Sequence, residues 1–370
     1  MIRKMRLRYL IIFITIGFSA LIFGFTFKRN DTYFASSEEK FPLIVGAIRW
    51  DGWVGPLNKA GLEIEHTLSP NKYHFRAPFY SKEISKDSIQ CREITQEIMD
   101  KDISYAKYAG INYWAFCWYS PHSGLDTARQ LYLNSRLRNK VKWCVILGTD
   151  SFNYVSDSKW LIRKFKEKNY QKVLNGRPLV YLFPSQGNKL SQLNLLRTLS
   201  KGAGIPNPYI VVMAFNSKNA DSICNHLQGD AISCYASTFN FETGAQYNGS
   251  AYYPTVLSSD KAGWDKYKAT GRDVIPWVTS GWDPRPRIER SVSWSTYYKS
   301  NGWAEEGTPN QIAENVQNAI IWAKSNADVD KSQAILIYAW NEFDEGGWIC
   351  PTFGFNTSRL EKIRKTLINK

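Results

Sequence analysis

Two glutamates spaced three residues apart, Glu342 and Glu345, are the residues of this sequence best suited by type and spacing to do chemistry. They belong to the segment 334–346, which begins as an apolar run and ends in polar residues. The apolar run predicts a buried strand, and side chains just past such a strand lie at the rim of an α/β barrel. Two carboxyl groups beside aromatic rings suit acid–base chemistry on a sugar. The alternative is a solvated turn after the strand, ended by Gly346 and Gly347.

Eight apolar, strand-like segments alternate with helical segments from residue 41 to the end of the chain. Strands that are apolar almost throughout are typical of parallel strands buried on both faces. Eight such βα units predict an α/β fold, a single-domain (β/α)8 TIM barrel. A doubly wound sheet would also alternate, but no GxGxxG motif follows the first strand, so the barrel is favoured. The predicted strands are 43–50, 111–120, 141–150, 177–183, 208–216, 230–237, 272–283 and the one that begins at residue 334.

In such a barrel, the residues just past each strand form one pocket. They combine aromatic rings for stacking with amides, acids and arginine for binding hydroxyl groups, as in a carbohydrate cleft. The candidate substrate-binding residues are Trp50, Asp51, Trp118, Tyr119, Asp150, Asn216, Tyr235, Trp282, Asp283, Arg287, Trp340 and Asn341.

Several of these candidates have a purely structural alternative. Trp50 and Trp118 could instead point into the core of the barrel. Asp283 precedes a proline and could simply form an Asx-turn. Arg285 and Arg287 could lie in a solvated loop, or they could bind an anionic sugar or a phosphate.

The first residues of the chain predict a membrane anchor or a signal peptide, residues 1–30. A basic start precedes the apolar stretch 9–27, whose length is near the roughly 20 residues that span a bilayer. The basic flank predicts a cytoplasmic N-terminus and an exported remainder. An uncleaved anchor is favoured, because the apolar stretch is long and no good cleavage site follows; a cleaved signal would give a secreted or periplasmic protein. Residues 31–40 are then a linker and 41–370 the catalytic domain.

Charge and composition exclude several other functions. The formal net charge is +14, but six of the basic residues lie in residues 1–30, and the others are spread out. This distribution does not predict a nucleic-acid groove. Four scattered histidines and six cysteines without zinc spacing give no reason to expect a metal, and no other cofactor is expected. No GxSxG, HExxH or P-loop motif is present.

The segment WNEFDEG, 340–346, resembles the WNEW-x-EG signature of glycoside hydrolase family 99 and, more closely, the corresponding segment of WbsX-like proteins of bacterial polysaccharide loci. Segments 106–119, 175–183 and 276–287 are similar to these families in the same order. Two departures stand out. Phe343 replaces the second tryptophan of the signature, and Cys350 stands before a proline where the family has an acid.

The resemblance implies a (β/α)8 barrel that cleaves α-linked, mannose-type glycans with retention and without a metal. It further implies that Glu342 takes the proton of the sugar 2-hydroxyl, which attacks the anomeric carbon. Glu345 would be the general acid and, later, the general base.

The leading hypothesis is therefore an exported, membrane-anchored glycoside hydrolase that acts on an extracellular or cell-surface polysaccharide. One alternative is a glycosyltransferase of polysaccharide assembly, although no DxD-type nucleotide-sugar signature supports it. Another is a non-catalytic barrel that binds glycans, which the departure at Cys350 favours.

Overall fold

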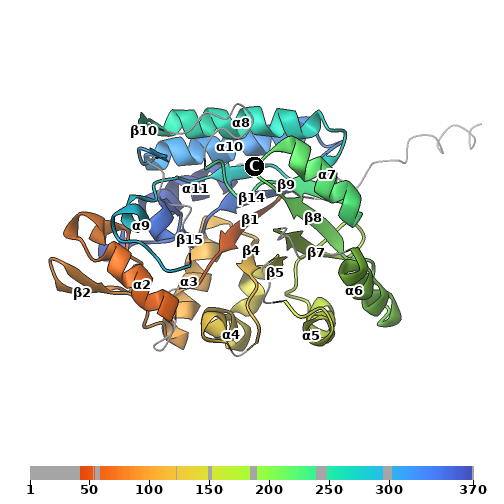
Figure 1. Ribbon diagram of the computed structural model, residues 1–370, viewed down its shortest axis with the longest axis horizontal. Coiled ribbons are helices and arrows are strands. Elements are labelled where there is room, and N and C mark those ends of the chain that lie inside the picture. The colour runs from red at the N-terminus through yellow and green to blue at the C-terminus, as the bar shows by residue number, and fades with distance from the viewer. Residues whose placement is uncertain are drawn as a thin grey trace, which may run out of the picture. The chain divides into compact units, whose positions relative to one another are not determined.

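A curled parallel β-sheet forms the centre of the fold (Figure 1). The computed structural model describes residues 42–52, 54, 59–121, 123–148, 152–183, 190–238, 248–294 and 302–368. The predicted anchor or signal peptide 1–30, its apolar stretch 9–27, the linker 31–40 and Asp150 lie outside the described residues. Within the described ranges, no helix is long and apolar enough to cross a membrane.

Each of the eight apolar segments predicted as a strand contributes to this sheet. Neighbouring strands along its main path run parallel, which confirms the predicted α/β class. From one edge of the sheet to the other, the strand order is β11-β9-β8-β7-β5-β4-β1-β14-β12. The two edge strands, β11 and β12, are separated in the chain only by Ile275 and Pro276. The sheet therefore curls until both of its edges lie within the segment 273–279. The strands are β1 (Ile44–Arg49), β4 (Tyr113–Cys117), β5 (Lys142–Leu147), β7 (Arg177–Leu182), β8 (Tyr209–Met213), β9 (Ala231–Ser233), β11 (Asp273–Val274), β12 (Trp277–Thr279) and β14 (Ala334–Tyr338).

The seventh predicted strand, 272–283, is divided in two and ends earlier than expected. Pro276 has no backbone N–H to donate to a neighbouring strand, and it lies at the break. Its carbonyl group still accepts a hydrogen bond from the Leu336 amide at 3.1 Å. The strand ends at Thr279, so the residues that follow it are available to pack against the loop after β14.

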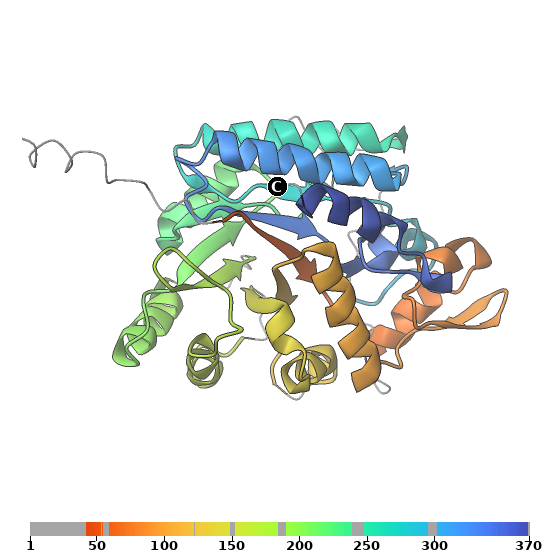
Figure 2. The same ribbon diagram turned by 180° about the vertical axis from the view of Figure 1, so that it is seen from behind.

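Helices follow most of the strands and surround the sheet, as Figures 1 and 2 show. They are α3 (Gln96–Ala109), α4 (Thr127–Asn134), α5 (Ser156–Phe165), α6 (Leu190–Gly202), α7 (Ser217–Leu227), α8 (Tyr253–Lys268), α10 (Pro309–Ser325) and α11 (Ser358–Ile368). The ends of these helices are fixed locally. Thr95 accepts a hydrogen bond from the Ile98 amide at the start of α3, and Thr308 and Gln311 form a capping box on α10.

Shorter elements complete the loops around the sheet. They are α2 (Lys59–Leu68), the hairpin of β2 (Lys82–Ser85) and β3 (Ser88–Gln90), β6 (Lys172–Val173), the pair of β10 (Asn248–Ala251) and β13 (Trp303–Ala304), α9 (Arg285–Glu289), and the hairpin of β15 (Asn341–Glu342) and β16 (Gly347–Trp348). The last two of these, α9 and the β15–β16 hairpin, carry the charged residues of the candidate site.

Many of the aromatic residues fill the core. Inside the sheet, the hydroxyl groups of Tyr113 and Tyr181 lie 2.7 Å apart and satisfy one another. Between the sheet and the helices, the Trp143 and Tyr170 ring centroids lie 5.1 Å apart. Fully buried tryptophans are Trp114, Trp118, Trp143, Trp264 and Trp340. Much of the high aromatic content therefore serves packing rather than ligand contact.

The close approach of β1 to β4 leaves no room for a side chain at Gly46. A Cβ atom at this position would lie 2.1 Å from Cζ of Tyr113. We expect Gly46→Ala to lower the free energy of unfolding by about 1–3 kcal/mol, because the buried Tyr113 ring must shift in a filled core. The midpoint of urea unfolding measures this change.

Gly202→Ala is the matched control, since nothing lies within 4 Å of the added Cβ atom at the end of α6. This variant should be neutral or more stable by roughly 0.4–1 kcal/mol, because alanine restricts the unfolded chain. Equal unfolding midpoints for Gly46→Ala and the wild type would contradict the packing described for β1 and β4.

Candidate active site

The polar segment after β14 folds into a tight, buried hairpin. Residues of β15 pair with β16, and a 3-10 turn over Phe343–Glu345 connects them. Gly346 ends the turn with φ of 84°, a conformation that glycine adopts without strain. The three carboxyl side chains of this hairpin are almost completely buried: Glu342 is 3% exposed, Asp344 2% and Glu345 6%. Burial on this scale means that each carboxyl group needs a partner or a proton.

Arg287, from α9, contacts all three carboxyl groups. Its Nε and Nη2 atoms donate to the two oxygens of Asp344 at 2.7 and 2.8 Å. Its Nη1 atom donates to Oε1 of Glu345, and its Nη2 atom lies 3.6 Å from Oε2 of Glu342. Asp344 also accepts a hydrogen bond from the Thr67 hydroxyl at 3.1 Å. The two-point contact with Asp344 thus fixes the plane of the guanidinium group, and its Nη1 and Nη2 atoms face the two glutamates.

Glu342 is the least well paired of the three carboxyl groups. The Tyr235 hydroxyl donates to its Oε1 atom at 3.0 Å, whereas its Oε2 atom has no hydrogen-bond partner among the described residues. Burial raises the pKa of Glu342 well above its usual range, repulsion by Glu345 adds to the rise, and Arg287 opposes it. The Oε2 atom lies 3.6 Å from Nη2 of Arg287, beyond hydrogen-bond distance, so this oxygen can still accept a hydrogen bond.

Both carboxyl oxygens of Glu345 accept hydrogen bonds. In addition to the Arg287 contact on Oε1, the Tyr338 hydroxyl donates to Oε2 at 2.5 Å. The Tyr235 and Tyr338 ring centroids are 5.4 Å apart, so the two phenol groups that serve Glu342 and Glu345 pack side by side. The arrangement places two glutamates with unequal hydrogen bonding in a single buried cluster, and two carboxyl groups in different environments are what acid–base catalysis requires.

The segment after β12 packs backbone against backbone on the carboxylate hairpin. A Cβ atom at Gly281 would lie 2.1 Å from the Gly346 carbonyl oxygen, and the Asp283 amide donates to the Glu345 carbonyl oxygen at 2.7 Å. Burial alone would raise the pKa of Asp283, but hydrogen bonds from Arg285 and Arg76 hold it below its usual range. Asp283 therefore anchors this contact, and its carboxyl group is already fully engaged.

A second buried network fixes the start of the hairpin. Arg49, at the end of β1, pairs with Asp51 at 2.9 Å and with Asp102 of α3 at 2.5 Å. The Trp340 indole donates to Asp102 at 3.0 Å, and the Asn341 amide donates to Asp51 at 2.9 Å. These predicted site residues thus hold the backbone that presents Glu342, and none of their polar groups is turned to the outside.

Aromatic rings border the carboxylate cluster, of which those of Trp50, Tyr119 and Tyr235 are partly exposed and those of Trp282 and Tyr338 are buried. The Arg287 guanidinium lies 5.2 Å from the centre of the Trp50 ring, and the Trp50 indole donates to the Tyr119 hydroxyl at 2.5 Å. The Trp282 and Tyr338 ring centroids are 6.2 Å apart. The partly exposed rings of Trp50, Tyr119 and Tyr235 are the ones on which a sugar ring can stack, and Trp282 and Tyr338 pack beneath the surface.

The remaining predicted candidates lie elsewhere. Trp118 is fully buried, with Arg129 4.2 Å from its ring centre, so other side chains cover both its faces. Asn216 accepts a hydrogen bond from the Asn219 amide at 2.8 Å and caps α7. Asp150 lies outside the described residues.

Two residues in contact with the catalytic candidates had no predicted role. Tyr338 is the last residue of β14 and belonged to the apolar run, yet its hydroxyl serves Glu345. Asp344 stood within the polar segment between the two glutamates, and only the structure pairs it with Arg287. In the described part of the chain, no group of three or more histidine, cysteine, aspartate or glutamate side chains is arranged to hold a metal ion. A tyrosine two residues before the motif was the available signal for Tyr338.

Solved structures similar to this fold include the GH99 endo-α-mannosidase from Bacteroides thetaiotaomicron. In complex with bis-tris propane, that enzyme matches with a TM-score of 0.55 at 14% sequence identity, over 88% of this chain and 95% of that chain. A second structure of the enzyme matches with a TM-score of 0.52 at 12% identity, with the same coverage. At such low identity, the likeness concerns the fold alone.

Comparison of the sequence with protein families gives a closer relationship. None of the curated proteins compared with the chain matches its sequence. The family model described as "Glycosyltransferase WbsX" matches residues 150–363, which include α9, Arg287 and the carboxylate hairpin. This match covers more than half of the chain, and the protein therefore belongs to the WbsX family.

Proposed function

We propose that this protein is a retaining glycoside hydrolase that acts on an α-linked, mannose-type glycan or on an extracellular or cell-surface polysaccharide. The observation that carries the proposal is the buried pair Glu342 and Glu345 around Arg287, in which Oε2 of Glu342 has no hydrogen-bond partner among the described residues. A sugar hydroxyl is the kind of donor that this oxygen lacks. The complete (β/α)8 barrel is part of the proposal, supported by the two sheet edges that meet in the segment 273–279.

In the proposed reaction, Oε2 of Glu342 accepts the proton of the sugar 2-hydroxyl, and the 2-oxygen of the sugar attacks the anomeric carbon at the same time. The bond to the leaving oxygen breaks, and Glu345 donates its proton to that oxygen. A 1,2-anhydro sugar results. Water then opens it at the anomeric carbon, Glu345 takes the proton of the water, and Glu342 returns its proton to the 2-oxygen. Two inversions give net retention.

The charges around Arg287 are suited to this exchange. In the described ranges, Arg287 is the one guanidinium that contacts all three buried carboxyl groups. If all three carboxyl groups were ionised, two negative charges would be left uncompensated. At least one proton is therefore retained, and in the free protein it is held on Glu342. A hydroxyl donor on Oε2 stabilises the ionised form of Glu342 and allows the proton to pass to Glu345, which becomes the acid.

The second candidate is a glycosyltransferase, which the description of the family model favours. The same two carboxyl groups would then activate an acceptor sugar and protonate the departing group of a donor sugar. Nucleotide-sugar turnover by the purified protein, without release of sugar from glycans, would select this function. Glycan binding with no turnover of any kind would select a non-catalytic barrel.

We also propose that the domain acts outside the cytoplasm, either anchored through the apolar stretch 9–27 or released after cleavage. The proposal is supported by the basic residues that precede this stretch in the sequence.

Glu345→Gln should abolish hydrolysis and preserve binding. Loss of a general acid and base lowers kcat/KM by about 10²–10⁴-fold, whereas the amide keeps the shape of the side chain. Reducing-end release from a panel of α-linked mannose oligosaccharides measures the activity, and calorimetry measures binding. Glu314→Gln, at an exposed carboxyl group of α10, is the control and should retain full activity. Full activity of Glu345→Gln would remove its assigned role.

Tyr235→Phe should shift the acid limb of the pH–activity profile to higher pH. Glu342 acts as a base only when ionised, so activity falls as the pH drops through its raised pKa. The Tyr235 hydroxyl donates to Glu342 and lowers its pKa, so its removal should raise that pKa further. Tyr252→Phe, at a ring that is 70% exposed, is the control. An acid limb that stays in place, or moves to lower pH, contradicts the role of Glu342 as the base.

A further inference from the structure

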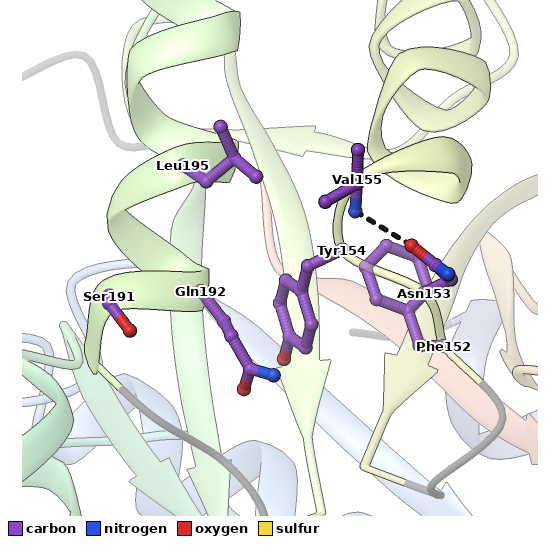
Figure 3. Close-up of a pocket in the computed structure, with 7 residues that line it drawn as sticks. All are labelled: Phe152, Asn153, Tyr154, Val155, Ser191, Gln192 and Leu195. Carbon is purple, nitrogen blue, oxygen red and sulfur yellow. Dashed lines mark hydrogen bonds between the residues drawn. The ribbon is translucent and has the colours of Figure 1, made fainter.

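A hollow follows the C-terminal ends of β5 and β7, as the carboxylate cluster follows the C-terminal end of β14. Figure 3 shows the residues that line this hollow. It is formed by the segment 152–155, which follows β5, and by the first turns of α6, which follow β7. The C-terminal ends of parallel strands meet on one side of a sheet, and both segments follow such ends. The hollow encloses about 520 Å³ and is lined by Phe152, Asn153, Tyr154, Val155, Ser191, Gln192 and Leu195. We call it the β5–β7 groove.

The lining of the β5–β7 groove combines apolar surface with neutral polar groups. Val155 is 66% exposed, an unusual position for an apolar side chain at the start of a helix. In Figure 3, the Tyr154 ring and the Gln192 amide lie next to each other across the groove. Among the described residues that line it, none carries a formal charge. This surface fits a neutral ligand with hydroxyl groups better than an anion or a cation.

The orientation of one amide in the groove is fixed. The Asn153 side-chain oxygen accepts hydrogen bonds from the amides of Val155 at 2.9 Å and Ser156 at 3.1 Å. The Asn153 amide in turn donates to Asp157 at 2.9 Å, so the backbone of this residue is held as well. The acceptor oxygen is thereby engaged, and the exposed side chain presents its NH2 group as a donor of fixed direction.

An aromatic connection joins the β5–β7 groove to the carboxylate cluster. Phe152 packs edge-on against Trp118, with ring centroids 4.9 Å apart. The next residue in the chain, Tyr119, accepts the hydrogen bond of the Trp50 indole, and Arg287 lies against the Trp50 ring. The buried Trp118 therefore contacts Phe152 of the groove and directly precedes Tyr119, which borders the carboxylate cluster.

We propose that the β5–β7 groove is a distal subsite that binds a neutral sugar segment of the same glycan whose linkage lies at Glu342 and Glu345. The subsite makes the protein select long oligosaccharides over short ones. The inference rests on the proposed function for the position of the cleaved linkage, whereas binding in the groove requires no catalysis.

The test compares binding of short and long probes by calorimetry, with the full chain carrying Glu345→Gln so that no probe is cleaved. The probes are disaccharides and pentasaccharides of α-linked mannose and of α-linked glucose. The groove variants are Val155→Asp and Gln192→Ala. Ile321→Asp is the matched control, because Ile321 is an exposed apolar residue (53%) on α10, outside the groove. Hydrolysis by the wild-type chain is measured separately.

At least one pentasaccharide should bind about tenfold more tightly than its disaccharide, the gain expected from an apolar contact and one or two hydrogen bonds. Val155→Asp and Gln192→Ala should remove this gain and leave disaccharide affinity unchanged, while Ile321→Asp keeps it. The subsite is overturned if affinity does not rise with chain length, or if the groove variants change neither probe or weaken both equally. Absence of hydrolysis together with the predicted binding pattern would refute the proposed activity and retain the subsite.

Discussion

The Arg287 guanidinium, buried against three carboxyl groups, is the interaction on which the rest of the candidate site depends. Asp344 accepts hydrogen bonds from Nε and Nη2 of the guanidinium, and Glu345 accepts one from Nη1. Oε2 of Glu342 makes no hydrogen bond to the guanidinium and lies 3.6 Å from Nη2. A single positive charge cannot neutralise all three, so the cluster keeps a proton. The unequal geometry gives two chemically similar residues different hydrogen-bond environments, and we propose that the proton is held on Glu342.

The fold positions this cluster through two supports of different kinds. On one side, Gly281 and Gly346 bring two loop backbones into direct contact, which a side chain at either position would prevent. On the other side, the Arg49 network ties the start of the hairpin to β1 and α3. Two of the four segments that resemble known families, 276–287 and 340–346, thus meet in space, and each provides part of the same charged cluster.

The sequence predicted the repeating strands well, because a parallel strand buried on both faces leaves an unmistakable apolar run. It predicted their bounds less well, since the break before β12 depends on Pro276 and the end of β12 on the loop that packs beside it. Among tryptophans, pattern alone could not separate Trp50, which borders the cluster, from Trp118, which is buried. That difference depends on the helices that cover each strand end. The partners of Arg287 were likewise invisible, because α9 and the hairpin are far apart in the chain.

The central claim is that the Arg287 cluster holds one proton, on Glu342, in the free protein. Infrared difference spectroscopy at neutral pH, comparing the wild-type chain with Glu342→Gln and separately with Glu345→Gln, tests this claim most directly. The account predicts a protonated carboxyl band in the wild type that disappears in Glu342→Gln and persists in Glu345→Gln. A wild-type spectrum in which Glu342→Gln removes only an ionised carboxylate band would contradict it.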